Sequence, residues 1–242
     1  MRIAVLASGG GSNLQALIDH FAGPAADHGR IVWVGSNVAD AFALTRAQRA
    51  GIACDVIADP SDDSAMLASV GAVGAELVVL AGYLKLVPAA VVRAFHGRML
   101  NVHPSLLPAF GGTGMFGDHV HRAVLASSAT VTGATVHFVD DVFDRGAIVA
   151  QWPVPVVADD TVRTLAARVL RVEHRLYPLT VAAVAAGTVY LGADGRTQRT
   201  RPSVAQTDPG WRFSLMTDAQ RSEHRPEDPA ALATDVSHLF AS

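Results

Sequence analysis

The sequence is poor in cysteine and in lysine, and each shortage removes a class of chemistry. Among 242 residues there is one cysteine, Cys54, and one lysine, Lys85. A single cysteine excludes a disulfide framework and a thiolate metal cluster. A single lysine leaves no second position for a phosphate-binding or Schiff-base lysine. Cys54 falls in an expected strand, and we predict that it is a buried core residue.

Charge and long apolar runs are also scarce. Only 17% of the residues are charged, the net charge is −3 and the sequence pI is about 6.3. No cluster of basic residues appears, so we expect no nucleic-acid partner. No segment approaches the roughly 20 apolar residues of a membrane span, and the apolar start at residues 3–7 is too short for a signal peptide. We therefore expect a cytoplasmic protein with no membrane contact.

Half of the residues are hydrophobic, and they alternate between short apolar runs and longer segments with helical period. This alternation predicts an α/β fold, a Rossmann-like, mostly parallel twisted sheet with helices on both faces. Several strands are continuously apolar, as expected when both faces are covered. The expected strands are residues 3–7, 31–34, 54–57, 77–81, 99–102 and 134–139. The expected helices are residues 13–21, 39–50, 88–95 and 120–126.

The last third of the sequence predicts a long helix and then a change of character. Apolar residues recur with helical spacing over 161–185, and Pro178 inside this stretch predicts a kink or a division. Residues 188–191 and 197–200 flank a turn and predict a hairpin. We expect one domain over residues 1–195 and a partly ordered C-terminal extension over 196–242, which is rich in Pro, Asp, Ser and Arg.

A run of three glycines, Gly9 to Gly11, follows the first expected strand. Glycine supplies the conformations of a tight strand-to-helix turn and lets a ligand approach the backbone. Ser12 and Gln15 form a capping-box pattern at the start of the next helix, and the positive end of a helix suits a phosphate. The pattern favours a phosphate site. The alternative is a glycine-rich turn without a ligand, because the Gly-Lys-Ser/Thr ending of a P-loop is missing.

The strand at 99–102 ends in two polar side chains, Asn101 and His103. Their spacing of two places them on the same side of a strand, and Pro104 keeps His103 out of the helical region. Ligands bind at the carboxyl ends of strands in open α/β sheets. An amide and an imidazole aimed at one point can stabilise an oxyanion and transfer a proton. The alternative is a structural histidine bonded to a loop carbonyl.

Three aspartates, Asp140, Asp141 and Asp144, lie in a loop between two strand-like runs. A carboxylate beside an imidazole raises the pKa of the histidine and fixes its orientation, and Gly146 allows Asp144 to lie on a rigid turn. Asp140 and Asp141 are equally consistent with ordinary turn-forming acids. The acids lack the spacing of metal ligands, so we expect no metal.

Five segments, in the same order along the chain, resemble the phosphoribosylglycinamide formyltransferases of the folate-dependent formyltransferase family. The resemblance covers about residues 1 to 195 and implies the formyltransferase fold. The segments are Ser-Gly-Gly-Gly-Ser-Asn-Leu-Gln at 8–15, Leu-Ala-Gly-Tyr-Leu-Lys-Leu at 80–86, Asn-Val-His-Pro-Ser-Leu-Leu-Pro at 101–108, Val-His-Phe-Val-Asp through Asp-Arg-Gly at 136–146, and Val-Glu-His-Arg-Leu-Tyr-Pro at 172–178.

The resemblance implies a role for each motif. Asn101, His103 and Asp144 match the catalytic residues. The glycine loop matches the site of the ribose phosphate, and Glu173 matches a position near the glycinamide end; the alternative for Glu173 is a solvated acid on the helix. The implied substrate-binding residues are Gly10, Gly11, Ser12, Asn13 and Glu173. The implied folate-binding residues, which meet the pterin largely through backbone groups, are Leu84, Lys85, Leu86, Val87, Asn101, Asp140, Asp141, Val142 and Phe143.

The resemblance also implies the reaction and its partners. The formyl group of 10-formyltetrahydrofolate, a co-substrate, passes to the amine of glycinamide ribonucleotide in purine biosynthesis, through a tetrahedral intermediate. Asn101 and protonated His103 stabilise its oxygen, while Asp144 supports the imidazolium and a water relays the proton. Removing one oxyanion donor costs roughly 10²–10³ in turnover. No metal is required, and we expect a homodimer.

Two departures from the family pattern concern the local folate contacts, the shape of the pocket and the affinity for folate or substrate. The loop at 111–118 is longer than in many relatives, and residues 59–64 offer no basic residue where relatives often carry one.

Three alternatives remain. Methionyl-tRNA formyltransferase adds a tRNA-binding domain, for which 196–242 is short and insufficiently basic. Formyltetrahydrofolate hydrolase usually adds an N-terminal regulatory domain, whereas here a strand begins at Arg2. A non-catalytic nucleotide-binding module would leave Asn101, His103 and Asp144 unexplained.

Overall fold

The computed structural model describes residues 1–23 and 25–200, and one compact unit spans Met1–Arg199. The predicted partial order of the C-terminal extension falls outside the described residues beyond 200. The strands are β1 (Arg2–Leu6), β2 (Arg30–Ser36), β3 (Ala53–Val56), β4 (Leu77–Leu80), β5 (Met99–His103), β6 (Val131–Phe138), β7 (Ile148–Pro155), β8 (Val189–Leu191) and β9 (Thr197–Arg199). The helices are α1 (Ser12–Phe21), α2 (Phe42–Arg49), α3 (Asp63–Ala72), α4 (Ala89–Ala94), α5 (Asp118–Ala126) and α6 (Val162–Ala185).

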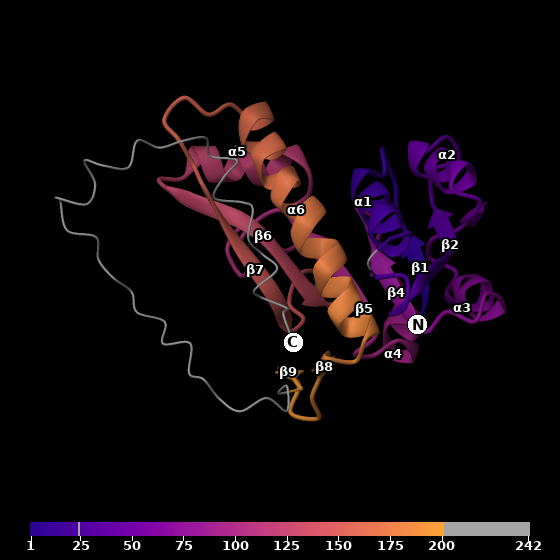
Figure 1. The fold of residues 1–242 in the computed structure, drawn as a ribbon. Helices are drawn as coiled ribbons and strands as arrows, with labels where there is room; N and C mark the ends of the chain where they lie inside the picture. Colours follow the sequence, from indigo (N-terminus) through magenta and orange to yellow (C-terminus); the bar gives the residue numbers. More distant parts are fainter. Residues whose placement is uncertain (24, 201–242) are drawn as a thin grey trace. The chain divides into compact units, whose positions relative to one another are not determined.

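Seven strands form one sheet in the order β3-β2-β1-β4-β5-β6-β7 (Figure 1). The strands from β3 to β5 are parallel, whereas β6 runs antiparallel to β5 and β7 antiparallel to β6. The predicted mostly parallel α/β sheet is confirmed. The chain order reverses around β1, which lies between β2 and β4. Such a reversal opens a crevice at the carboxyl ends of the strands, where ligands bind in this class of fold.

The sequence prediction gave β7 only as a short strand-like run after the aspartate loop and missed α3, and both shortfalls have physical reasons. Strand β7 carries Pro153 and Pro155, which lack the N–H of a ladder, but it pairs with β6 alone among the described strands and so tolerates them. Helix α3 is built mostly from small residues and buries only Met66 and Val70 in the core, so its sequence carries no clear apolar stripe.

Helices cover both faces of the sheet (Figure 1). On one face α3 and α4 pack together over alternate residues of β1, β4 and the start of β5. On the other face α1 packs against α6, which also contacts β5, β6 and β7. Every residue of β4 is buried, which explains its continuous apolar sequence. The core therefore lies in two layers, one on each side of the parallel strands.

Helix α6 continues through Pro178, so the predicted division of this segment does not occur. It begins with a capping box in which the side chain of Thr161 accepts from the Thr164 N–H. The Tyr177 hydroxyl lies 2.9 Å from the Leu80 carbonyl oxygen and 3.0 Å from that of Leu100. These contacts attach α6 directly to the last residue of β4 and to the second residue of β5.

Two smaller predictions have different outcomes. The hairpin is confirmed, because β8 and β9 pair antiparallel. Cys54 is partly exposed in β3 at the edge of the sheet, so its predicted full burial is wrong.

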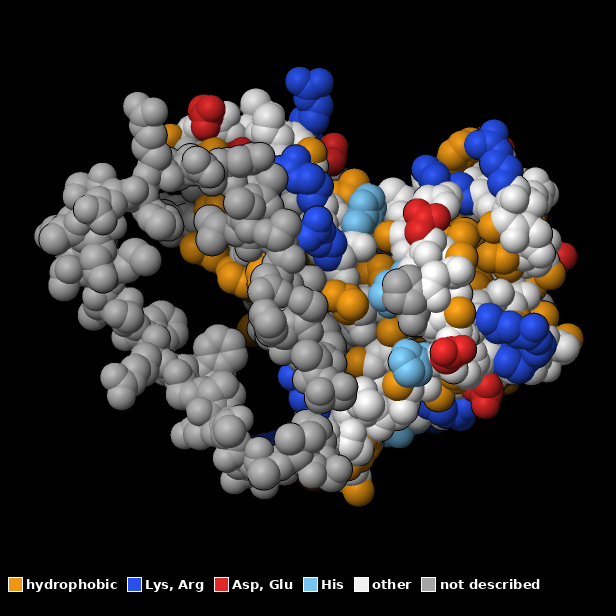
Figure 2. All heavy atoms as spheres, viewed as in Figure 1, with side chains coloured by type: hydrophobic (Ala, Val, Ile, Leu, Met, Phe, Trp, Pro, Cys, Tyr) orange, Lys and Arg blue, Asp and Glu red, His pale blue; other side chains and the backbone are white. Residues whose placement is uncertain are grey.

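Among the helices of the described residues, none combines the length and the apolar character needed to cross a bilayer. On the face in Figure 2, basic and acidic side chains are interspersed over the described part.

Candidate functional site

A cavity of about 800 Å³ opens at the carboxyl ends of β4 and β5, beside the start of α1. It is bounded by the 112–118 loop, by the first turn of α5 and by one face of α6. Seven of the predicted site residues line it together: Asn13, Leu84, Asn101, His103, Phe143, Asp144 and Glu173. The fold thus brings residues 160 positions apart in the sequence to one space.

The glycine loop turns directly from β1 into α1. Gly11 is the N-cap of α1 with φ 68°, and a side chain there would come within 2.8 Å of the backbone of Ala43. No side chain caps the helix, so the predicted capping box of Ser12 and Gln15 is wrong. An uncapped first turn leaves backbone N–H groups and the positive end of the helix dipole available to an anion.

Arg46, a residue that the sequence prediction missed, holds the glycine loop from α2. Its Nε donates to the Gly10 carbonyl at 2.8 Å and its Nη1 to Gln15 Oε1 at 3.0 Å. The same guanidinium lies over the Phe42 ring. A fixed positive charge therefore stands beside the uncapped end of α1, which strengthens its suitability for a phosphate.

Asn101 and His103 point to the same side of β5, as their spacing predicted, and both line the cavity. His103 is 3% exposed, and each of its ring nitrogens faces an oxygen atom. Its Nε2 donates to the Phe110 carbonyl at 2.8 Å, and its Nδ1 lies 3.4 Å from Asp144 Oδ2. The imidazole therefore has a fixed orientation in the wall of the cavity.

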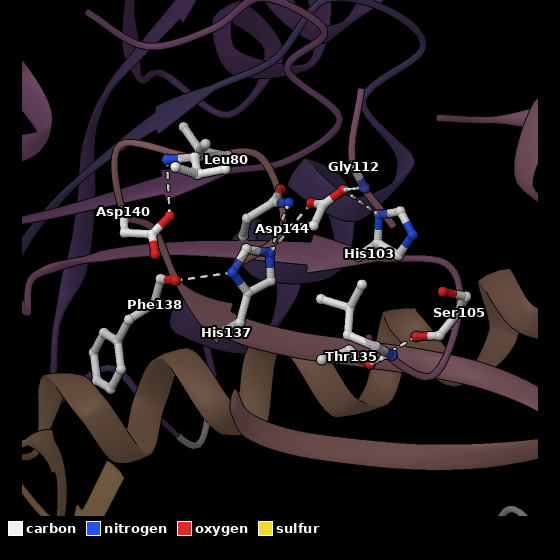
Figure 3. Close-up of polar contacts among 12 residues, drawn as sticks. Leu80, His103, Ser105, Gly112, Thr135, His137, Phe138, Asp140 and Asp144 are labelled. Atoms are coloured by element: carbon white, nitrogen blue, oxygen red, sulfur yellow. Dashed lines mark hydrogen bonds and ion pairs between the residues drawn. The ribbon is translucent and has the colours of Figure 1, made fainter. Parts of the chain in front are cut away.

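Asp144 lies between two imidazoles, those of His103 and His137 (Figure 3). Its Oδ2 also accepts the Gly112 N–H at 2.9 Å. Asp144 has φ 56°, a left-handed conformation that aspartate tolerates better than most residues. Gly146, two residues on, packs so closely against the Phe138 carbonyl that no side chain fits there. The loop is thereby fixed with its carboxylate facing His103.

The electrostatics of this group correct the expectation that His103 has a raised pKa and is protonated. Burial lowers the pKa of His103, and the attraction of Asp144 and the bond to Phe110 offset this only in part, so the net pKa is below its ordinary value. Burial raises the pKa of Asp144, but the polar groups around the carboxylate, the Gly112 N–H among them, outweigh this effect and lower the net value. In this site Asp144 is a carboxylate and His103 is neutral near pH 7.

Glu173 faces the glycine loop from α6 and is 6% exposed, so the alternative of a solvated acid is wrong. Its Oε2 accepts from Asn13 Nδ2 at 2.6 Å. Burial raises the pKa of Glu173 to about 7, against the smaller opposite effect of the Asn13 bond. A carboxyl group that ionises near neutrality therefore lies beside the start of α1, in the wall of the same cavity as Asn101, His103 and Asp144.

The remaining predicted residues lie outside the cavity wall. Val87 packs in the apolar core, while Lys85, Leu86, Asp141 and Val142 have exposed side chains. Asp140 accepts the Val142 N–H in a local turn, which agrees with the alternative of a turn-forming acid. The predicted residues that do not line the cavity are Gly10, Gly11, Ser12, Lys85, Leu86, Val87, Asp140, Asp141 and Val142.

Two histidines were also missed by the sequence prediction. His121, on the first turn of α5, lines the cavity, is 4% exposed, and its Nδ1 has no hydrogen-bond partner among the described residues. His137 lies directly opposite Asn101 in the β5–β6 ladder. Only the antiparallel register reveals this pairing, although the polar residue inside the apolar run of β6 was a signal. Within residues 1–23 and 25–200, no group of three potential ligands could hold a metal ion.

Comparison with known proteins agrees with this geometry. A family model described as formyl transferase matches residues 1–181. The phosphoribosylglycinamide formyltransferase of Escherichia coli (strain K12) is 40% identical over 193 residues, which are 77% of this chain and 88% of that protein. The chloroplastic phosphoribosylglycinamide formyltransferase of Vigna unguiculata is 41% identical over 201 residues, 80% of this chain but only 64% of that protein.

A solved structure gives the same result for the fold. The phosphoribosylglycinamide formyltransferase of Anaplasma phagocytophilum superposes with a TM-score of 0.76 at 35% identity, covering 84% of this chain and 96% of that one. The resemblance inferred from the five sequence segments is thereby confirmed. The chain belongs to the formyl transferase family, and the three relatives named above are phosphoribosylglycinamide formyltransferases.

Proposed function

We propose that this chain transfers the formyl group of 10-formyltetrahydrofolate to the amine of glycinamide ribonucleotide, a step of purine biosynthesis. The observation that carries the proposal is the meeting of Asn101, His103 and Asp144 in the wall of one cavity that also contains Glu173 and borders the glycine loop. A polar cluster of this kind suits acyl transfer. The names of the relatives supply the substrate class.

The glycine loop is the proposed site of the ribose phosphate. Gly10 and Gly11 keep the backbone open, Ser12 and Asn13 begin an uncapped helix, and Arg46 stands beside them. Three features of an anion site therefore coincide: free N–H groups, a helix dipole and a fixed guanidinium. Beside this loop, Glu173 accepts from Asn13 and is placed to bind the ammonium form of the substrate amine when its carboxyl is ionised.

The folate is proposed to enter between the segment after β4 and the 140–144 loop. Tyr83, Leu84 and Phe143 give this part of the cavity apolar and aromatic walls, and the longer 112–118 loop adds Met115 and Phe116. Such walls fit a flat heteroaromatic ring. The backbone of Lys85, Leu86 and Val87 on one side, and of Asp140, Asp141 and Val142 on the other, is proposed to recognise the pterin edge.

The proposed reaction is a direct transfer with no covalent enzyme intermediate. The neutral substrate amine forms a bond to the formyl carbon, whose carbonyl electrons move to oxygen. Asn101 donates an N–H to this oxyanion. His103, neutral beforehand, takes up the proton of the amine through a water, and the imidazolium forms beside the Asp144 carboxylate. The same proton passes to the folate nitrogen as its bond to the formyl carbon breaks.

An assay of 10-formyltetrahydrofolate consumption with and without glycinamide ribonucleotide tests the proposal. We expect consumption only when the ribonucleotide is present, with one formylated product formed for each folate released. Consumption without an acceptor would assign the chain to the hydrolases. Transfer to methionyl-tRNA but not to the ribonucleotide would assign it to the tRNA-formylating enzymes. Binding without consumption would leave a non-catalytic nucleotide-binding module.

The proposal also includes a cytoplasmic location and a homodimer. The cytoplasmic location agrees with the finding that no helix of the described residues is suited to cross a membrane. Cell fractionation tests the location, and light scattering of the purified chain tests the dimer. Recovery in an organelle or membrane fraction, or a monomer mass at assay concentration, would contradict these parts of the proposal.

A further inference from the structure

His137 lies one layer behind the cavity. It is 2% exposed on β6, and it is not among the residues that line the cavity. Its ring contacts two side chains that do line it, Asn101 and Asp144. Any influence of His137 on the reaction must therefore pass through one of these two residues, because the ring itself does not reach a substrate.

The position of the ring proton follows from a backbone contact. The His137 Nδ1 lies 2.8 Å from the Phe138 carbonyl oxygen. A carbonyl oxygen only accepts hydrogen bonds, so Nδ1 must carry the hydrogen. In the neutral imidazole, Nε2 then has a free lone pair and acts as an acceptor. The backbone of β6 thus selects one of the two tautomers.

The acceptor at Nε2 discriminates between the two ends of the Asn101 amide. Asn101 Nδ2 lies 3.2 Å from Nε2 and donates one of its two hydrogens to it. An amide turned by 180° has nearly the same shape, so packing alone separates the two orientations poorly. After such a turn, however, Oδ1 would face the Nε2 lone pair, which replaces a hydrogen bond by a repulsion.

We propose that His137 is a positioning residue, whose bare Nε2 fixes the Asn101 amide so that its second N–H is available to the oxygen of the tetrahedral intermediate. This inference rests on the proposed formyl transfer. The competing route through Asp144 would need an N–H at Nε2. The 3.6 Å between Nε2 and Asp144 Oδ1 exceeds hydrogen-bond distance, which favours the route through Asn101.

Two substitutions distinguish the role of Nδ1 from the role of Nε2 in the His137 ring. In His137→Asn an amide replaces the Nδ1 side of the ring and nothing replaces Nε2. In His137→Gln the longer side chain can place its amide oxygen near the position of Nε2, where it accepts from Asn101. We expect kcat to fall by about 10² in His137→Asn, as for a lost oxyanion donor, and by roughly tenfold or less in His137→Gln. KM should change little in either. Equal losses in two variants with the melting temperature of the wild type would overturn the proposal.

A double-mutant cycle identifies the residue through which His137 acts. In an Asn101→Ala background the loss from His137→Asn should shrink to about threefold or less, because residues that act as a unit are not additive. In an Asp144→Ala background it should remain close to its full size. A full loss beside Asn101→Ala, or a loss that disappears only beside Asp144→Ala, would overturn the proposal.

The tautomer can be measured without any activity. In the full chain with ¹⁵N-labelled histidines, we expect long-range ¹H–¹⁵N spectra at neutral pH to show the hydrogen of His137 on Nδ1, with the signal assigned by its absence in His137→Gln. A hydrogen on Nε2 would overturn the inference even if the variants failed to fold. Absence of formyl transfer by the wild type would instead refute the proposed function, and this spectrum would be unaffected.

Discussion

Two regions of the cavity are built in different ways. The glycine-loop region, formed by the turn from β1 into α1 with Arg46 beside it, presents mainly backbone groups. The polar cluster presents the side chains of Asn101 and His103 from β5 and of Asp144 from a loop, with His137 of the antiparallel β6 behind them. Backbone groups at a helix end suit the binding of an anion, whereas side chains held in a buried network suit the movement of protons. The first region should therefore govern affinity and the second turnover.

The largest effect should come from the polar cluster. We expect His103→Ala to lower kcat by roughly 10²–10³ and to leave KM for the ribonucleotide within about twofold, because the ring stabilises the reacting atoms and not the phosphate. Steady-state kinetics and a melting curve measure this. His96→Ala, at an exposed histidine, is the control. Full activity of His103→Ala in a folded protein would refute the catalytic assignment.

Glu173 joins the two regions, and its titration should appear in the stability of the protein. Its pKa of about 7 in the folded state is above the 4.5 of an ordinary glutamate. Between these values the folded state binds more protons than the unfolded state, so the free energy of unfolding falls as the pH rises from 4.5 through 7, by about 3 kcal/mol at most.

Denaturant unfolding at several pH values tests this slope in the wild type and in Glu173→Gln. The variant should lose most of the slope, whereas Asp27→Asn, at an exposed acid, should retain it. The same titration should reduce kcat/KM for the ribonucleotide below pH 7, because only the ionised carboxylate attracts an ammonium group. An identical slope in Glu173→Gln would show that this carboxyl does not titrate as expected.

A smaller effect should come from the glycine loop itself. Gly11→Ala introduces a side chain at a positive φ against the backbone of Ala43, so we expect a loss of about 1–3 kcal/mol in the free energy of unfolding. KM for the ribonucleotide should rise while kcat changes less. Gly10→Ala is the matched control, because nothing lies within 4 Å of a side chain there. A selective loss of kcat in Gly11→Ala would contradict the inference that the glycine-loop region governs affinity and the polar cluster governs turnover.

The smallest effect should follow from removing the charge beside this loop. Arg46→Gln loses the bond to the Gly10 carbonyl, and we expect KM for the ribonucleotide to rise by roughly fivefold to tenfold at low salt, and by less at high salt. Arg49→Gln, on the same helix and also over the Phe42 ring, is the control. Equal effects of the two substitutions would mean that Arg46 acts only through the general charge of the surface.

The sequence predicts best where a local rule determines the structure. Continuous apolar runs identified the buried parallel strands, and the spacing of Asn101 and His103 placed both in one wall. Prediction was poorer where the structure depends on which strands pair and in which register. Strand β7 carries two prolines that only an edge position tolerates, and the partnership of His137 with Asn101 depends on the register of β6. The proximity of Asp144 to His103 was expected from family resemblance and not from spacing.

The charge state of the cluster could not be predicted in this way. A carboxylate near a histidine predicts a raised pKa, but the net direction for His103 is downward because burial is the larger effect. Burial depends on how α5, the 112–118 loop and β6 close around the ring, which is a property of the whole fold. The capping box failed for a similar reason, since Gly11, packed against Ala43, occupies the N-cap position instead of Ser12.

The hydroxyl of Tyr177 has a consequence for the spacing of the two substrates. Tyr177 lies one helical turn after Glu173, and its contacts with the Leu80 and Leu100 carbonyls anchor α6 at a set depth and register on the sheet. Leu100 directly precedes Asn101. The positions of Glu173, proposed to bind the acceptor, and of Asn101, proposed to bind the formyl donor, are therefore both fixed relative to Tyr177. The buried Tyr177 hydroxyl, outside the cavity wall, thus helps to set the distance across which the one-carbon unit would be transferred.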